Sequence, residues 1–268
     1  MRLIIFSRNL ADQSEEKFYH EFHNVHAEQT STIAANTGIL HQYIQGYAAN
    51  VRKANPKLSI PLPIRAEVVS VALLTWPSIK VMRGLFSSSG YQKSAGAHHF
   101  ADASVVCATE NLEPEPAGVR TSSQVMLHLL LKPRGDSATF KSKWDSHADL
   151  VRSLPSRPTL YQRHLSVPLT REQATKLYKG TQFAVGEGNW IDGGVEEFVF
   201  DSSVHMNTFL EAYSQKLDES YRNFVEVSAS SAAIFDQTVV YGPQRGLKQS
   251  IVGTAIGAAL SIKDTLGL

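Results

Sequence analysis

The chain contains an internal repeat, and this feature limits the possible folds more than any other. Residues 4–47 read IIFSRNLADQSEEKFYHEFHNVHAEQTSTIAANTGILHQYIQGY, and residues 129–167 read LLLKPRGDSATFKSKWDSHADLVRSLPSRPTLYQRHLSV. In both copies an apolar strand ends in a basic residue and a polar turn with Asp and Ser follows. A helix then carries Phe, a second aromatic residue four positions later, and His-Ala. Each copy closes with a strand that begins Leu-x-Gln, at 40–42 and at 160–162.

The segments that follow each copy also correspond. Residues 66–76 and 195–201 are rich in β-branched and aromatic side chains and predict strands. Each is followed by a predicted helix, one opened by Pro77 as a first-turn proline and one by an Asp-Ser-Ser N-cap signature. A last strand, 103–110 or 232–242, closes each unit. The order strand, helix, strand, strand, helix, strand therefore occurs twice, which is the ferredoxin-like unit.

The boundary between the two units lies at 111–124, where Pro, Gly and Ser cluster. The expected fold class is α+β, with one unit at 1–112, a second at 122–243 and a C-terminal tail at 244–268. The tail is apolar, rich in small residues and too short to span a bilayer. We expect it to pack as an arm or short helix across the units or against a second chain.

Two long loops interrupt the pattern. The first, 51–65, contains three prolines, and the second, 168–194, contains a predicted short helix at 170–178. Long loops in compact domains are often lids or binding loops, but simple decoration is an equally good interpretation.

The composition excludes several classes of protein. Apolar residues make up 43% and the net charge is +1 without a basic run, so a packed core is expected and nucleic acid is not an expected partner. Cys107 is the single cysteine and lies in an apolar strand, so a disulfide is impossible within the chain and a cytoplasmic location is the default. The N-terminus lacks signal-peptide features, and no apolar run reaches the length of a membrane span.

No sequence motif marks a cofactor. The chain has no GxxxxGK[ST] phosphate loop and no GxSxG nucleophile motif, and the lone Gly-x-Gly in VGEGNW lacks the strand and helix that a nucleotide site needs. Nothing marks a haem pocket. We therefore expect no cofactor.

The duplicated pattern resembles the EthD family of the dimeric α+β-barrel superfamily, over about residues 1–242. The first copy departs from the family in having Phe22 where Trp is usual, and the second has one residue fewer between its aromatic residue and its histidine. The residues that carry the resemblance are Ser14, Glu15, Glu16, Phe18, Phe22, His26-Ala27 and Tyr43-x-Gln45 in the first copy, and Phe140, Trp144, His147-Ala148 and Tyr161-Gln162 in the second.

The resemblance implies a fold and a pocket. In this superfamily two units pack their four-stranded sheets face to face, and a tandem chain can do this within itself, although a homodimer remains possible. The resemblance also implies a pocket between the first helix of a unit and its sheet, lined by histidine and aromatic residues. Phe22 and Trp144 are expected walls of the two pockets.

Three histidines, His20, His23 and His26, are spaced three residues apart in the first helix. With about 100° per residue and Phe18 at zero, His26 lies near 80°, on the flank of the buried face. His23 and His20 lie near 140° and 200° and are expected on the surface, so the three do not converge on a metal ion.

The second copy retains one histidine at the buried edge, His147. We therefore pair His26 with His147 as candidate general acids or bases, because an imidazole titrates near neutral pH. The alternative is a core histidine hydrogen-bonded to a backbone carbonyl. The family resemblance favours the catalytic interpretation.

Other side chains are candidates for binding a substrate. His41 and Tyr43 share one face of their strand, and Tyr161 lies in the equivalent strand of the second copy. Tyrosines stack on aromatic ligands and donate hydrogen bonds. Trp76 ends a strand and could line a pocket mouth, and His128 places a polar group inside an apolar strand. Ordinary packing explains each of these equally well.

Three functions remain open from the sequence. The first is a cofactor-independent lyase or cyclase of secondary metabolism, which acts on an aromatic or polyketide-like molecule by acid–base chemistry such as decarboxylation, dehydration or cyclisation. The second is a cofactor-free oxygenase or oxidoreductase of aromatic substrates. The third is a non-catalytic small-molecule binding or accessory protein. All three are functions that the resemblance implies.

Overall fold

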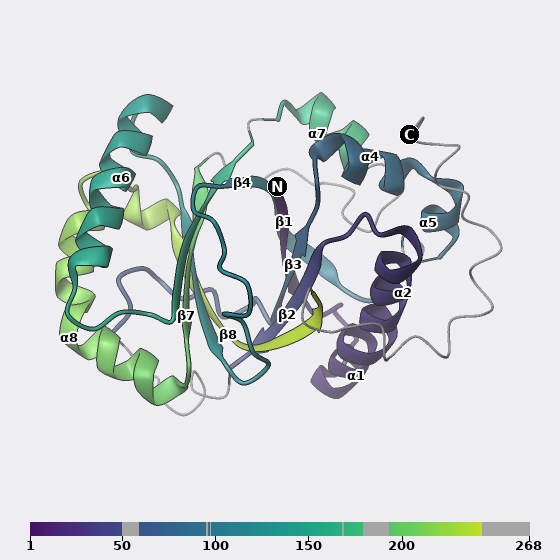
Figure 1. The fold of residues 1–268 in the computed structure, drawn as a ribbon, viewed down its shortest axis with the longest axis horizontal. Coiled ribbons are helices and arrows are strands. Elements are labelled where there is room, and N and C mark those ends of the chain that lie inside the picture. The colour runs from purple at the N-terminus through teal and green to yellow at the C-terminus, as the bar shows by residue number, and fades with distance from the viewer. Residues whose placement is uncertain (50–58, 95, 97, 168, 179–192, 243–268) are drawn as a thin grey trace.

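The strands of the chain close into one antiparallel barrel (Figure 1). The computed structural model describes residues 1–49, 59–94, 96, 98–167, 169–178 and 193–242. Within these residues the barrel strands are β1 (Arg2–Arg8), β2 (Gln42–Ala48), β3 (Ser70–Thr75), β4 (Asp102–Asn111), β5 (Val125–Leu131), β6 (Leu160–Ser166), β7 (Gly194–Phe200) and β8 (Ser231–Tyr241).

The two halves of the chain contribute the same strand order. Around the barrel the order is β1-β3-β2-β8-β5-β7-β6-β4, so β4-β1-β3-β2 is followed by β8-β5-β7-β6. The predicted fold class, two fused ferredoxin-like units that form a barrel within one chain, is thereby confirmed. The tail at 244–268 lies outside the described residues, and the unit limits at 112 and 122 stay a prediction.

Two seams join the halves. Along one seam β2 pairs with β8, from Tyr43 opposite Tyr241 to Ala48 opposite Phe235. Along the other, β4 pairs with β6 from Thr109 to Asn111. Both seams are antiparallel, so each sheet continues into the other through backbone hydrogen bonds and neither half has a free edge there.

The helices cover the outside of the barrel, and apart from α7 (Arg171–Tyr178) each lies over the strands of its own half (Figure 1). The first half has α1 (Glu15–His20), the π-helix η1 (Glu21–His26), α2 (Ala27–Thr37), α4 (Ile79–Ser87) and α5 (Ser89–Lys93). The second half has α6 (Ser137–Ser153), α7 (Arg171–Tyr178), α8 (Ser203–Tyr221) and the 3-10 turn η2 (Val227–Ala229). Among the described residues, none of these helices combines the length and apolarity needed to cross a membrane.

Side-chain caps fix where the helices begin. Ser14, Ser78, Asp136 and Ser202 each accept a hydrogen bond from a backbone N–H three residues later. Pro77 therefore lies one residue before the cap of α4, and the prediction that it occupies the first helical turn is wrong. The prediction of a short helix at 170–178 is confirmed by α7.

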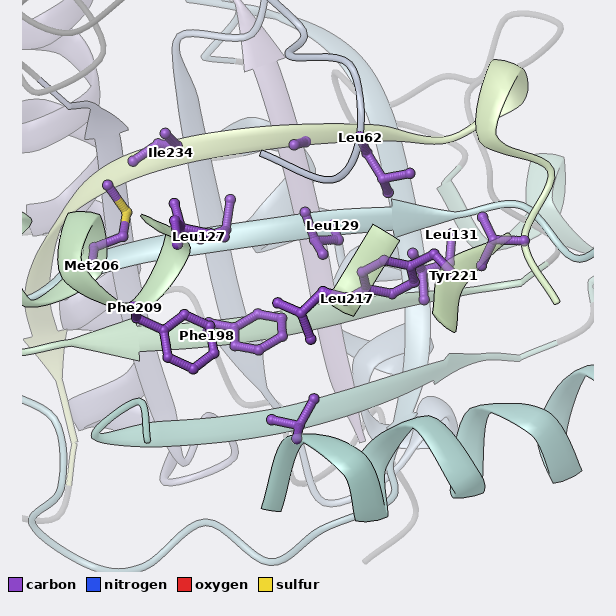
Figure 2. Close-up of a cluster of buried hydrophobic side chains, with 14 of the residues drawn as sticks. Leu62, Leu127, Leu129, Leu131, Phe198, Met206, Phe209, Leu217, Tyr221 and Ile234 are labelled. Atoms are coloured by element: carbon purple, nitrogen blue, oxygen red, sulfur yellow. The ribbon is translucent and has the colours of Figure 1, made fainter. Parts of the chain in front are cut away.

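Three apolar cores result from the alternation of side chains along the strands. One fills the barrel, with Ile4, Phe6 and Phe235 among its residues. The other two lie between the sheet and the helices of each half. Figure 2 shows the second of these, in which Phe198 of β7 lies against Phe209 of α8.

The long loops cross from one half to the other. In the first loop, Leu62 packs into the helix-side core of the second half, and Ile64 forms a bridge to Ala232 of β8. In the second loop, Tyr178 of α7 packs into the helix-side core of the first half, and α7 lies beside α4 (Figure 1). These reciprocal contacts tie the halves together. The other parts of the two loops, 51–58 and 179–192, lie outside the described residues.

Candidate functional site

A fully buried carboxylate, Glu196 of β7, organises the space between sheet and helices in the second half. It is 0% exposed. The hydroxyls of Tyr161 and Tyr221 each donate a hydrogen bond to one of its oxygens, and Trp144 Nε1 donates from 3.1 Å. Trp144 can lie this close to the sheet because Gly194 has no Cβ; one built there would be 2.5 Å from the indole ring.

His147 completes this cluster, which we call the Glu196 cluster (Trp144, His147, Tyr161, Glu196 and Tyr221). Its Nδ1 lies 2.8 Å from Ser220 Oγ, and its Nε2 lies 3.5 Å from Glu196 Oε2. Its ring packs 4.3 Å from that of Tyr221. The sequence predicted His147 at the buried edge of its helix, and the structure places it there, 1% exposed.

The protonation states in the cluster follow from burial and charge. Burial raises the pKa of Glu196, but the charge and hydrogen bond of His147 and the tyrosine hydroxyls outweigh it, so the net pKa lies below the ordinary value. Burial and the Glu196 carboxylate hold the pKa of both Tyr161 and Tyr221 well above that of a free tyrosine. The cluster is therefore an ionised carboxylate held by protonated phenols.

The same region of the first half is built from aromatic rings around His26. Phe18 stacks on Phe22 at 5.7 Å, both rings contact Phe100, and His26 lies 4.8 Å from Phe100. Burial, with a smaller contribution from His98, lowers the pKa of His26 to about 3. Its imidazole is therefore neutral at physiological pH, and its Nδ1 has no hydrogen-bond partner among the described residues.

A π-helix explains how His26 reaches this position. His26 lies four positions after Phe22 in the sequence, whereas His147 lies three positions after Trp144. A π-turn closes its hydrogen bond over one more residue than an α-turn, and η1 spans Glu21–His26, where the extra residue occurs. The first copy thus accommodates the insertion in a wider helix and keeps its histidine on the buried side.

The π-helix also changes the position of His23. A regular α-helix predicts His23 at the surface, and this prediction is wrong. Its ring packs against Tyr19, Phe22 and Tyr47, and its Nε2 is buried without a hydrogen-bond partner among the described residues. His20 is exposed as predicted and lies 3.0 Å from the Asn24 side chain.

Gln45 links the helix to the sheet in the first half. Its Nε2 donates to the backbone oxygen of Phe22 and to the hydroxyl of Tyr43, both at 2.7 Å. Its Oε1 and the hydroxyl of Ser70 on neighbouring β3 are buried and make no hydrogen bond of regular geometry among the described residues, although the Gln45 side chain also interacts with the imidazole of His23. Buried polar atoms are normally hydrogen-bonded, so this concentration of unpartnered atoms marks a place for a ligand or water. We call His26, Tyr43, Gln45 and Ser70 with the Phe22 ring the His26 site.

A second carboxylate, Glu197, lies inside the barrel. Arg120 donates to both of its oxygens at 2.8 and 2.7 Å, and Arg2 lies 3.5 Å away. Glu115 bridges the two arginines at 2.8 and 3.0 Å, so two cations balance two anions. Burial raises the pKa of each carboxylate, but the charge of Arg120 outweighs it, so the pKa of Glu115 falls to about 2.

Three candidates from the sequence lie away from the His26 site and the Glu196 cluster. His41 is exposed and precedes β2. Trp76 follows the end of β3 remote from Ser70 and packs on Phe86. His128 faces the barrel interior, 3.4 Å from Glu197 and between the rings of Phe6 and Phe235. The remaining candidates fall into the two helix-side regions: Phe22, His26 and Tyr43 in the first, Trp144, His147 and Tyr161 in the second.

Both glutamates of β7 and their partners Tyr221 and Arg120 were missed from the sequence. The available signal was the pair of acidic residues within the apolar strand VEEFVF. Alternation sends the two side chains to opposite faces, and a strand covered on both sides leaves both buried. Among the described residues, no group of three or more His, Cys, Asp or Glu side chains could hold a metal ion.

Comparison with known proteins supports this architecture. No protein-family model matches the chain. The chain is 27% identical over 192 residues to "Chalcone isomerase cfoK" of Aspergillus candidus, which covers 69% of this chain and 73% of that protein. Among solved structures, an anthrone oxidase-like protein aligns with a TM-score of 0.51 and 7% identity, over 89% of this chain and 92% of the other. The chain has the dimeric α+β-barrel fold.

A putative monooxygenase from Lactobacillus acidophilus NCFM aligns with a TM-score of 0.49 and 8% identity, over 89% of this chain and 94% of the other. At these identities the structural likeness concerns the fold alone. The resemblance to the EthD family stays a prediction.

Proposed function

We propose that the protein is a cofactor-independent isomerase or cyclase that closes a ring in a phenolic, chalcone-like ketone by acid–base chemistry. The observation that carries the proposal is His26, a neutral imidazole with an unpartnered Nδ1 among aromatic rings. The 27% identity to a chalcone isomerase and the resemblance to the EthD family support it.

The reaction needs proton transfers and no change of oxidation state. In a 2′-hydroxychalcone, His26 takes the phenolic proton as the phenolic oxygen adds to the β-carbon of the enone. The two events occur together because an imidazole of low pKa is too weak a base to hold this proton before the new bond forms. A carbon–oxygen bond forms, the carbon–carbon double bond is lost, and the resulting enolate accepts a proton at the α-carbon. The product is an isomer of the substrate, so atoms and electrons balance without a co-reactant. Proton transfer by a positioned side chain contributes about 10²–10⁴-fold to such a rate.

Tyr43 is the candidate that polarises the ketone. Its hydroxyl accepts a hydrogen bond from Gln45, so its own proton is available to donate to a carbonyl oxygen. Burial raises the pKa of Tyr43 above its ordinary value, so the hydroxyl stays protonated. A donor aimed at the oxygen on which negative charge develops stabilises the enolate.

The first half is the better catalytic site because its polar groups are not already engaged. In the second half, the Glu196 carboxylate is held by two tyrosines and an indole, of which Trp144 and Tyr221 are fully buried and Tyr161 is half-buried. In the first half, His26 lies 6.2 Å from His98, which is 22% exposed, so its imidazole lies close to the protein surface. The Glu196 cluster then serves chiefly to stabilise the second half.

The test is to incubate the protein with 2′-hydroxychalcone in D₂O and follow the loss of the yellow enone absorbance. The expected product is an isomer with one deuterium on the carbon next to the ketone. His26→Ala should lower the rate by about 10²–10⁴-fold, and His20→Ala, an exposed histidine of the same helical segment, should not change it.

Running the reaction in air and under argon separates the alternatives. Equal rates support the isomerase. A product that gains oxygen or loses hydrogen only in air would replace the proposal with an oxygenase. Bound but unchanged substrate would replace it with a binding protein, and full activity of His26→Ala would remove His26 from the mechanism.

A further inference from the structure

The two halves place different residues at equivalent positions around their histidines. Phe18 and Phe140 both lie four residues after a helix cap. Counting back eleven residues from each gives Ser7 and Leu129, whose partners on the next strand are Ser70 and Glu196. Ser70 therefore stands in the first half where Glu196 stands in the second.

The neighbouring strands extend this correspondence. Tyr47 pairs with Ser70 and Arg163 pairs with Glu196. Two residues earlier, on the same face, these strands carry Gln45 and Tyr161. Gln45 thus stands where the second half has Tyr161, whose phenol donates to the carboxylate. The first half has a shorter side chain without a ring at one position and a hydroxymethyl group in place of a carboxylate at the other.

The surroundings of the two positions are otherwise alike. His26 lies 4.8 Å from Phe100 and 6.2 Å from His98, as His147 lies 5.5 Å from Phe224 and 4.3 Å from Tyr221. At these two positions the second half therefore holds phenols, Tyr161 and Tyr221, where the first half has Gln45 and His98. The phenol of the first half is that of Tyr43, whose hydroxyl is bonded to Gln45.

The unpartnered atoms of the first half define what would fit there. Gln45 Nε2 is engaged by Phe22 and Tyr43, and the side chain also interacts with His23. Because an amide oxygen can accept two hydrogen bonds, Oε1 can still accept one from a ligand. The buried Ser70 hydroxyl can donate or accept. A hydroxyl group supplies both a donor and an acceptor, whereas a carboxylate could not donate to Gln45. Aromatic rings are close by: Phe18 stacks on Phe22, whose backbone oxygen accepts from Gln45, and contacts Tyr47, the strand partner of Ser70.

We propose that Gln45 and Ser70 bind a phenolic hydroxyl of the ligand, so that the ligand's ring takes the place that Tyr161 fills in the second half. This hydroxyl is additional to the one that His26 deprotonates. The inference deepens the proposed function, on which it rests, because it names a second phenol as a feature of the substrate.

A binding experiment tests this without turnover. The probes are 4-nitrophenol and its methyl ether, 4-nitroanisole, titrated into the full chain by calorimetry. The phenol should bind once per chain and at least tenfold more tightly than the ether, since the ether cannot donate to Gln45. Equal affinity of the two probes, or two equivalent sites per chain, would overturn the proposal.

Two variants locate the hydroxyl. Ser70→Ala should weaken the binding of 4-nitrophenol by about tenfold and leave the affinity for 4-nitroanisole unchanged. Its melting temperature should not fall, because the lost hydroxyl had no partner. Gln45→Tyr, which copies the second half, should abolish binding of both probes in a folded protein. Gln215→Met, an exposed glutamine on α8, is the matched control.

Unchanged phenol affinity in folded Ser70→Ala and Gln45→Tyr would refute the site. The proposed reaction can fail while this binding persists. The proposed reaction can also proceed at full rate in Ser70→Ala and Gln45→Tyr. In that case the ring-closing chemistry stands and the hydroxyl-binding site does not.

Discussion

Glu196 and Glu197 are consecutive residues of β7, and both are completely buried, yet their carboxylates lie on opposite faces of the sheet. Glu196 lies under the helices, among tyrosines and His147, and Glu197 lies inside the barrel against Arg120. Each buried charge therefore depends on a different set of partners, and neither set can replace the other.

Removing the arginine partner of Glu197 should be costly. Arg120→Met removes the two short hydrogen bonds to this buried carboxylate and leaves it with the longer contact to Arg2 and with the imidazoles of His164 and His128. We expect the free energy of unfolding to fall by about 3–5 kcal/mol, as measured by urea denaturation. Arg152→Met, which removes an arginine from a more exposed pair with Glu113, should cost under about 1 kcal/mol. If both variants lost a similarly small amount of unfolding free energy, the ion pairs of Glu197 inside the barrel would contribute little to stability.

Acid should destabilise the protein through its buried histidines. Burial lowers the pKa of His26 to about 3 and that of His164 to about 4, from an ordinary value of 6.5. Both are neutral in the folded chain, so they do not change the free energy of unfolding above pH 6.5. As the pH falls from 6.5 towards the folded pKa, the unfolded chain binds more protons than the folded chain, and the free energy of unfolding decreases.

At pH 5 each of these histidines should lower the free energy of unfolding by about 2 kcal/mol relative to its value at pH 7.5. His26→Gln should therefore lose less stability than the wild type between pH 7.5 and pH 5, by about this amount. Urea denaturation at the two pH values measures the difference. Parallel losses in the two proteins would mean that His26 is protonated in the folded state.

The barrel interior should not tolerate even one added methyl group at Gly46. A Cβ at this position would lie 2.6 Å from Met126 and 2.7 Å from Phe235 and Val71. We expect Gly46→Ala to destabilise the fold by about 1–3 kcal/mol through overpacking. Gly242→Ala, whose Cβ would meet no atom closer than 3.7 Å, is the control. Thermal melts of both variants test this, and equal melting temperatures would contradict it.

Deleting one residue should convert the π-helix into an α-helix. Asn24 is exposed within η1, and its removal gives the first copy the aromatic-to-histidine spacing of the second. The variant should fold, with His26 still buried and with activity changed because His23 shifts. Deleting Ser146 from α6 should instead displace His147 from Glu196 and cost more than about 3 kcal/mol. Denaturation of both deletions provides the comparison, and similar stabilities would refute this account of η1.

The repeat made the fold predictable. Cap residues, strand composition and the two His-Ala helices specified nearly every element, because local preferences and the repeated hydrophobic pattern agree with the final architecture. The alternation of side chains along a strand also holds in β6, where Tyr161 and Arg163 lie on one face and Gln162 and His164 on the other.

The site was harder to predict because it depends on departures from regular periodicity and on long-range partners. A fixed 100° per residue placed His23 at the surface, since it did not allow for the π-helix. Glu197 is stabilised by Arg120, which comes from the segment between the units, and sequence spacing does not reveal that pairing. His128 was assigned to a pocket because it is a polar residue within an apolar strand. The sequence did not reveal that its side chain faces the barrel interior.

The closure of one barrel from both halves of a single chain has an evolutionary consequence. When two identical subunits form such a barrel, every substitution appears on both sides of the symmetry axis, so one gene must serve both copies. Here β2–β8 and β4–β6 join two different sequences. Selection can then alter one half without altering the other. A first half with Gln45 and Ser70 where the second half has Tyr161 and Glu196 is an arrangement that a symmetric ancestor could not have held.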